Sequence, residues 1–304
     1  MNSEEQQVLK RLKAARNAYL KRNYARAIEH YRWIEQAIQD DEKNLPIIWI
    51  ELGWSYYYNH QYAEAIEYLS KALGSSHLNA EQRFDCNRII GFAYQQLNEW
   101  DRAIEYLQEA LRQPVQESTK RYAYFELGKI YFIQRELDAA ESHLLKADKL
   151  FRMEESDYKF TIHYYLGFIE FFRKHYEQAR RHFQYIIQNS ASSSTRATGF
   201  FGLAHLFYEE NDYPALLDVV EKIVQLDPNF YDKETLGFFA CLACMYLYKW
   251  EEMEDFFQEL KKRYPAGRYA SYYPFFEEAL RERKLPDPFQ KRRVKPGGLL
   301  DNKN

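Results

Sequence analysis

A small residue recurs along this chain at an almost constant spacing, and this feature constrains the fold more than any other. The distance from one copy to the next is always between 37 and 39 residues. The recurring residues are Ala15, Gly53, Gly91, Gly128, Gly167, Ala204 and Cys241. Self-similarity at a fixed period of this length is the signature of a repeat architecture. The sequence therefore predicts an array of repeats, each stacked on its neighbours.

Each copy has the pattern of two helices joined by a short turn. Apolar residues recur at steps of three and four, a few polar residues interrupt them, as at 59–61, 97–99 and 210–212, and the pattern then resumes. A large residue opens each second helix: Tyr24, Tyr62, Trp100, Leu137, Tyr176, Tyr213 and Trp250. The small residue of the first helix (helix A) lets the second helix (helix B) come close. An alanine in helix B has the matching role: Ala27, Ala65, Ala103, Ala140 and Ala179.

The pattern resembles that of the tetratricopeptide repeat (TPR) family over about residues 8–265. It is clearest in the run Leu52, Gly53, Tyr56, Tyr62, Ala65, Leu69 and Ala72. The resemblance implies an all-α fold, a right-handed α-solenoid of about seven TPR-like helix pairs. The family repeats every 34 residues, and these copies are longer. The extra residues fall in stretches such as 74–81, 113–120 and 189–196, so either helix B gains a turn or the loops lengthen.

The end of the chain departs from the repeat. Residues 269–284 predict a last helix that caps the array, so residues 1–284 are expected to form one superhelical domain with its capping helix. Residues 285–304 contain Pro, Gly and the basic run 291–295, and they predict a flexible basic tail. A second interpretation is that this tail, through Leu285, Pro286 and Phe289, lies in the chain's own groove.

Charge and composition exclude several kinds of partner. The formal net charge of −3 gives no reason to expect nucleic acid, and RNA-binding helical repeats would need basic inner faces. The longest uncharged run, residues 236–248, is shorter than the roughly 20 apolar residues that span a bilayer. Three cysteines and an N-terminus without an apolar stretch favour a cytoplasmic protein. Self-association stays open.

In proteins of the resembled family, the A helices line the concave face. At the positions of these helices that do not serve stacking, this sequence is mostly aromatic, and Arg88 and Lys129 are isolated cations. The predicted partner-binding residues are Trp54, Tyr57, Tyr58, Arg88, Phe92, Phe125, Lys129, Phe132, Tyr164, Phe168, Phe171, Phe172, Phe201, His205, Tyr208 and Phe238. Either they form a groove for an apolar or amphipathic segment of another protein, or they pack on one another inside a tight superhelix.

The sequence predicts a protein-interaction module, that is, an adaptor, scaffold or chaperone. The alternative is a regulatory peptide-sensing TPR protein that acts on a separate effector chain. No enzyme is expected, because no phosphate loop, nucleophile elbow or catalytic cluster occurs. No cofactor or metal is expected either. Cys241 and Cys244 have no second ligand pair nearby and occupy packing positions.

Overall fold

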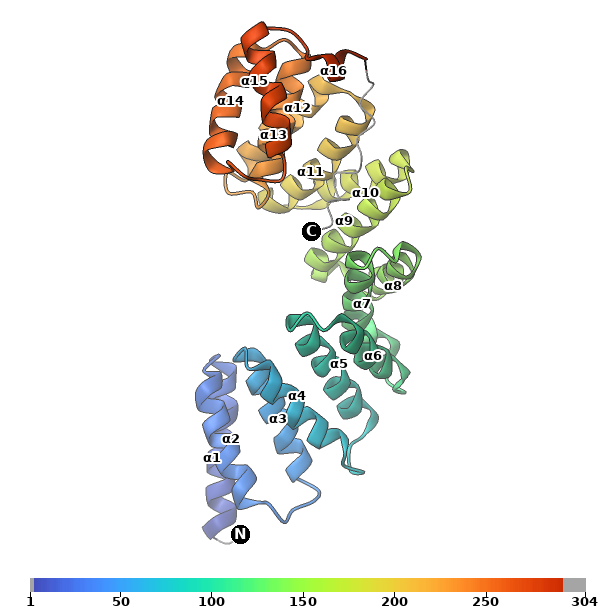
Figure 1. Cartoon of the computed structure of the whole chain (residues 1–304). Helices are drawn as coiled ribbons and strands as arrows, with labels where there is room; N and C mark the ends of the chain where they lie inside the picture. The colour runs from blue at the N-terminus through green and yellow to red at the C-terminus, as the bar shows by residue number, and fades with distance from the viewer. Residues whose placement is uncertain (1–2, 292–304) are drawn as a thin grey trace. The chain divides into compact units, whose positions relative to one another are not determined.

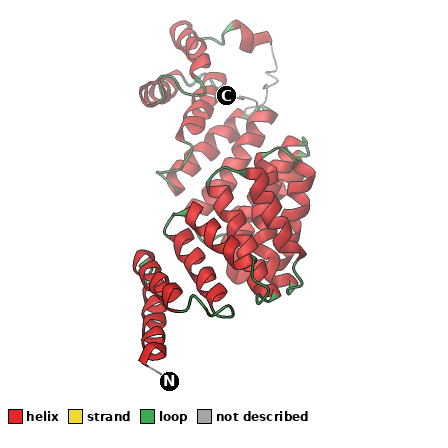
Figure 2. Cartoon of the chain, turned by 60° about the horizontal axis from the view of Figure 1, so that its bottom comes forward, coloured by secondary structure: helices red, strands yellow, loops and turns green. Residues whose placement is uncertain are grey.

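The computed structural model describes residues 3–291, and within them every regular element is a helix (Figure 2). The chain divides into two compact units, residues 1–152 and residues 153–304, here called unit 1 and unit 2. The helices are labelled in Figure 1. In each unit, consecutive helices pack against one another in A–B pairs. The fold is the all-helical α-solenoid that the repeat predicts.

Unit 1 contains four A–B pairs. They are α1 (Ser3–Leu20) with α2 (Tyr24–Ala37), α3 (Leu45–Tyr58) with α4 (Tyr62–Leu73), α5 (Ala80–Gln96) with α6 (Trp100–Arg112), and α7 (Arg121–Ile133) with α8 (Leu137–Leu150). A short 3-10 helix, Glu117–Lys120, leads into α7.

Unit 2 contains three further pairs and the end of the described chain. The pairs are α9 (Ser156–Phe172) with α10 (Tyr176–Asn189), α11 (Ser193–Glu210) with α12 (Tyr213–Leu226), and α13 (Lys233–Tyr246) with α14 (Trp250–Arg263). Then follow a 3-10 turn (Ala270–Tyr272), α15 (Tyr273–Glu282) and α16 (Asp287–Lys291). Residues 269–284 were predicted as one helix. The α-helix begins only at Tyr273, because Pro274 favours the first turn of a helix.

The turn inside each pair has the same geometry in every repeat. One residue adopts a left-handed conformation, with φ between 57° and 66°: Arg22, His60, Asn98, Arg135, Lys174, Asn211 and Tyr248. At His60, the N–H of Gln61 donates to the carbonyl of Tyr56 at 2.9 Å and the N–H of His60 donates to that of Tyr57 at 3.0 Å. These bonds satisfy the last carbonyls of helix A in a Schellman motif. Two residues later each B helix begins, in all seven cases at the predicted large residue.

The small residues have the predicted packing role. A Cβ atom on Gly53 would lie 2.4 Å from Cγ of Leu69, and one on Gly91 would lie 2.7 Å from Cγ of Leu107. Since real Cβ atoms do not come this close, only glycine allows helix B to lie at this distance. The matching alanines of helix B, such as Ala65, are fully buried.

The additional residues of each repeat lengthen loops, as expected, or A helices rather than the expected B helices. Between α4 and α5 they form a loop at residues 74–79. Between α10 and α11 they instead lengthen α11, which has 18 residues, while α10 has 14 residues like most B helices, and only residues 190–192 lie outside the two helices. The predicted tail begins at residue 285. Its residues 287–291 form α16, and residues 292–304 lie outside the described part of the chain.

Candidate functional site

The predicted partner-binding residues all lie on A helices. In unit 1 they are Trp54, Tyr57 and Tyr58 on α3, Arg88 and Phe92 on α5, and Phe125, Lys129 and Phe132 on α7. In unit 2 they are Tyr164, Phe168, Phe171 and Phe172 on α9, Phe201, His205 and Tyr208 on α11, and Phe238 on α13. Buried members of this set are more frequent in unit 2 than in unit 1.

In unit 2 most of these side chains pack on one another. Phe168, Phe201, His205, Tyr208 and Phe238 expose between 1% and 6% of their surface. The imidazole of His205 lies at the centre. Its ring centroid is 4.8–5.9 Å from four phenylalanine rings, those of Phe168, Phe171, Phe201 and Phe239. In this part of the chain the inner aromatic residues therefore behave as packed interior.

His205 is enclosed as a neutral group. Burial lowers the pKa of its imidazole to about 4, because a charged ring would lose its hydration among the phenylalanines. Within the described part of the chain, its Nδ1 atom has no hydrogen-bond partner. Such a group costs free energy and is normally paired. His205 is therefore the least satisfied polar residue of this interior.

A loop residue covers the edge of the same interior. Tyr231 follows α12, and its hydroxyl lies 2.7 Å from that of Tyr164 on α9. Its ring lies 5.8 Å from the ring of Phe201. Burial raises the pKa of Tyr164 well above its usual value. Phe171 and Phe172 are half-buried and complete this group.

In unit 1 the corresponding residues form an open surface. Tyr58 is 39% exposed, and Trp54, Tyr57 and Phe92 are half-buried. Stacked and edge-on contacts connect the rings at centroid distances of 5.3–6.0 Å. We call this group the aromatic surface: Tyr19, Tyr24, Trp54, Tyr57, Tyr58, Tyr62, Arg88 and Phe92.

Three members of the aromatic surface were missed in the sequence. Tyr24 and Tyr62 were assigned to the opening of the B helices, where the structure also places them. Tyr19 lies in the first repeat at the position that Tyr57 occupies in the second. Extending the same register to the first repeat would have included it.

Arg88 lies among the rings of the aromatic surface. Its guanidinium carbon is 5.2 Å from the ring centroid of Trp54 and 5.3 Å from that of Phe92, which are cation–π distances. Asp85 accepts a hydrogen bond from it at 2.9 Å, and among the described residues no other acceptor does so. Because a guanidinium carries five N–H donors, Arg88 can bind a further acceptor.

Each of the two inner cations, Arg88 and Lys129, has a carboxylate partner on its own helix. On α7, Lys129 donates to Glu126 at 2.8 Å, and Gln95 donates to the same carboxylate at 2.9 Å. Burial, and then the charge of Glu126, raise the pKa of Tyr57 to about 12. Phe125 is buried and Phe132 half-buried. The α7 side is thus a charge-neutral border of the aromatic surface.

The cysteine pair has the predicted packing role. Cys241 and Cys244 are both fully buried and free. Burial raises the pKa of Cys244 to about 12, so its thiol stays protonated and unreactive. Residues 3–291 contain no cluster of three or more His, Cys, Asp or Glu suited to a metal ion. None of their helices combines the length and apolar character that crossing a membrane requires.

Comparison with known families supports the repeat resemblance. The family model of the SusR N-terminal TPR domain matches residues 10–149, which lie in unit 1. This confirms the resemblance to the TPR family over that part of the chain. No curated protein matches the chain.

Several solved structures share the fold at low sequence identity. The apo form of RapI is 13% identical, with a TM-score of 0.69, and the match covers 90% of this chain and 81% of that one. The apo form of the quorum sensor NprR from B. thuringiensis is 16% identical, with a TM-score of 0.60 and coverages of 85% and 76%. A tetratricopeptide repeat protein from Parabacteroides merdae is 15% identical, with a TM-score of 0.59 and coverages of 91% and 99%.

Proposed function

Because the chain resembles TPR proteins over residues 10–149, we propose that it is a protein-interaction module that holds a segment of another protein on the aromatic surface of unit 1. The carrying observation is the partial exposure of the stacked Trp54 and Tyr58 rings there, whereas Phe168, at the position equivalent to Trp54 in unit 2, is buried. Clustered exposed aromatic rings on a folded protein usually mark an interaction site. An adaptor, scaffold or chaperone role fits this arrangement.

The aromatic surface suits an apolar or amphipathic segment. Ring contacts such as the stack of Trp54 on Tyr58 hold the side chains in place before a partner arrives. Binding then orders few side chains, which reduces its entropic cost. Aromatic residues and Arg are also the residue types that contribute most to binding energy at interfaces. The tyrosine hydroxyls can form polar contacts because this surface is partly exposed to solvent.

The buried interior of unit 2 has a supporting role in this proposal. Its rings are already covered by one another and by Tyr231, so we assign them to the stability of the scaffold. We place the protein in the cytoplasm, because its three cysteines are free and a reducing compartment keeps them so. The proposal includes no catalytic step.

The test is a pull-down from the native cell that compares the wild type with a Trp54→Ala/Tyr58→Ala variant. A protein that the wild type recovers should be lost by the variant, while both keep the same helicity. Tyr248→Ala is the matched control, since Tyr248 is 58% exposed on a turn of unit 2. Equal recovery by the wild type and the Trp54/Tyr58 variant would refute the proposed surface.

A second candidate is a regulator that senses a peptide and acts on a separate effector chain. Its support is the similarity in fold to the quorum sensor NprR. The two candidates differ in the response to binding. A regulator should change its hydrogen-exchange protection far from the aromatic surface when its ligand binds, whereas an adaptor should be protected only at the contact.

A further inference from the structure

The repeat places the same pair of tyrosines at two points of the chain. In unit 1, Tyr24 opens α2 and stacks on Tyr58 at the end of α3, with centroids 5.4 Å apart. In unit 2, Tyr213 opens α12 and stacks on Tyr246 at the end of α13, at 4.0 Å. Both pairs join the first residue of a B helix to the last residue of the next A helix. They are therefore equivalent elements.

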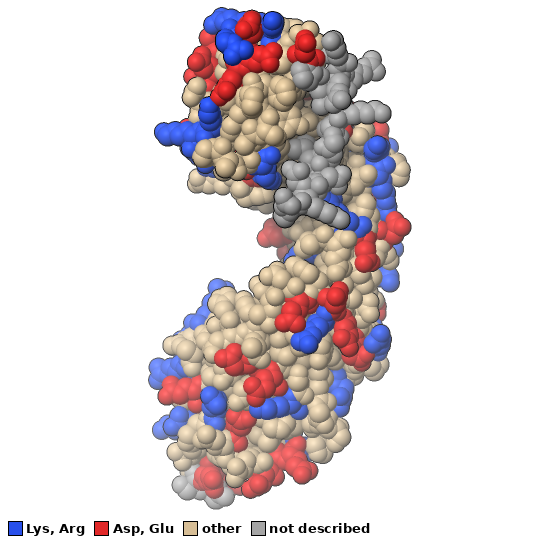
Figure 3. Space-filling model, in the orientation of Figure 1, with Lys and Arg blue, Asp and Glu red and all other residues tan. Residues whose placement is uncertain are grey.

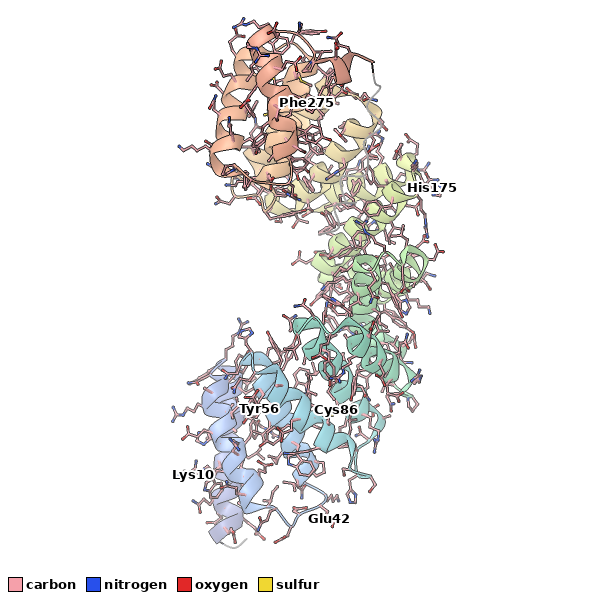
Figure 4. The ribbon with its side chains drawn as sticks, in the orientation of Figure 1. Lys10, Glu42, Tyr56, Cys86, His175 and Phe275 are labelled. Carbon is pink, nitrogen blue, oxygen red and sulfur yellow. The ribbon has the colours of Figure 1, made fainter. Side chains whose placement is uncertain are left out.

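In unit 2 this element is contacted by a further ring of the same chain. Phe289, on the short α16, lies 6.3 Å from the ring of Tyr246 and 5.5 Å from that of Phe275 on α15, which is labelled in Figure 4. Phe289 is only 6% exposed. Its N–H donates to the carbonyl of Pro286 at 2.8 Å, so a tight turn presents the ring. A phenylalanine on a short segment thus contacts the element in unit 2, at its Tyr246 ring.

In unit 1 no described residue covers the equivalent pair from outside. Tyr58 keeps 39% of its surface exposed although Tyr19, Tyr24 and Trp54 surround its ring. Leu20, which follows Tyr19 at the end of α1, has 81% of its surface exposed. An additional aromatic ring would bury apolar area here, as Phe289 does in unit 2.

The charges around the pair favour an acidic occupant. Lys21 and Arg22 are exposed at the turn between α1 and α2, and Arg26 is exposed in the first turn of α2; none of the three forms an ion pair with a described residue. Beside Tyr58, Arg88 is the charged group that acts on the hydroxyl, and its guanidinium has N–H donors to spare. At the hydroxyl of Tyr19, the carboxylate of Glu51 acts more strongly than Arg88. Figure 3 shows Lys and Arg side chains interspersed with Asp and Glu on the surface of unit 1. Carboxylates of a partner would be attracted to this site.

We propose that the Tyr24–Tyr58 surface binds a short acidic segment of a partner protein, with a phenylalanine as its anchor. The segment Asp287-Pro288-Phe289 of this chain has the same combination of a carboxylate and a phenylalanine. The inference rests on the proposed function and adds the chemistry of the partner segment to it.

The test uses a fluorescent peptide with the sequence of residues 285–290, LPDPFQ, titrated onto the purified full chain. The peptide should bind with a measurable anisotropy change. Tyr24→Ala/Tyr58→Ala in the protein, or alanine in place of phenylalanine in the peptide, should weaken binding by about thirtyfold or more, as for an interface hot spot. Replacing the peptide aspartate with asparagine should weaken binding and reduce its dependence on salt.

A second variant distinguishes a loss of binding from a loss of folding. Arg22→Glu/Arg26→Glu changes only exposed side chains, and it should also weaken the peptide while leaving the melting temperature near that of the wild type. Tyr248→Ala is the matched control and should bind normally. The proposal is overturned if the peptide does not bind, or if Tyr246→Ala abolishes binding and Tyr24→Ala/Tyr58→Ala does not. Failure of the peptide alone, with pull-down still dependent on Trp54 and Tyr58, would leave the proposed function standing.

Discussion

The ring of Phe183 on α10 lies against Gly202 on α11 so closely that a Cβ atom on Gly202 would be 2.2 Å from its Cδ1 atom. The same ring lies against Gly167 on α9, where a Cβ atom would be 2.5 Å from Cε1. Equivalent positions in three other repeats hold a leucine: Leu69, Leu107 and Leu144. The larger ring of Phe183 therefore requires a glycine on each of two neighbouring helices.

Gly202→Ala is expected to destabilise unit 2 by about 3 kcal/mol, the upper end of the usual cost of overpacking. A helix interior normally favours Ala over Gly by about 1 kcal/mol, so a loss here would identify the close contact as its cause. The measurement is urea unfolding followed by circular dichroism.

The control for this prediction replaces the side chain at position 183 with a smaller one, which makes room for a Cβ atom at position 202. Phe183→Leu, which copies the other repeats, should recover much of the stability lost in Gly202→Ala, so the two changes should not be additive. Gly74→Ala lies at an exposed helix end with a negative φ and should have little effect. If Gly202→Ala stabilises the protein, the described contact with Phe183 is incorrect.

Trp54 and Phe168 occupy the same position of their repeats, directly after the small residue. Phe168 is 5% exposed and packs on Phe183 and His205, whereas Trp54 is half-buried. Phe168→Ala should therefore cost about 3–5 kcal/mol, the usual cost of emptying a core site. Trp54→Ala should cost about 1 kcal/mol. Equal losses in urea unfolding would contradict the assignment of one residue to the interior and the other to a surface.

The repeat itself could be predicted because it follows from local rules. The glycines that admit Leu69 or Leu107, the large residues that open each B helix and the polar turns are all set by near neighbours in sequence. Each of these features recurs in several of the seven repeats, so the repeats together indicate the fold more strongly than any one of them does.

The state of the inner face could not be predicted, because it depends on contacts between repeats. The sequence has aromatic residues at these positions in both units, and periodicity alone does not separate a groove from a packed interior. In unit 2, Phe239 and Tyr231 lie against His205 and Phe201 and close the surface. Tyr231 belongs to a loop outside the repeat pattern. The open surface of unit 1 follows from the lack of such a cover among the described residues.

His205 should make unit 2 sensitive to acid. Its pKa is about 4 in the folded state, because of burial, and 6.5 in an exposed chain. Between these values the unfolded state binds the proton and the folded state does not, so stability falls as the pH is lowered from about 6.5 to about 4. The total loss is roughly 3 kcal/mol at 1.36 kcal/mol per pKa unit.

His205→Leu, which copies Leu242 at the equivalent position of the seventh repeat, removes this titration. The variant should lose less stability than the wild type between about pH 7 and about pH 4.5, measured by urea unfolding at each pH. Its free energy of unfolding at neutral pH should also be about 1 kcal/mol higher than that of the wild type, because the unpaired Nδ1 atom is removed. Parallel pH profiles for the two proteins would exclude His205 as a contributor.

Lys174 occupies the left-handed position of the turn between α9 and α10, with φ 64°. A residue with a Cβ atom pays about 1 kcal/mol or more in this conformation, and glycine does not. Lys174→Gly should therefore raise the free energy of unfolding by about 1 kcal/mol, despite the larger entropy of glycine in the unfolded chain. Lys174→Val is the opposing variant, because a β-branched side chain tolerates this conformation least, and it should destabilise. Both are measured by urea unfolding. If the two variants shift stability in the same direction, the backbone conformation at Lys174 does not limit the stability of this turn.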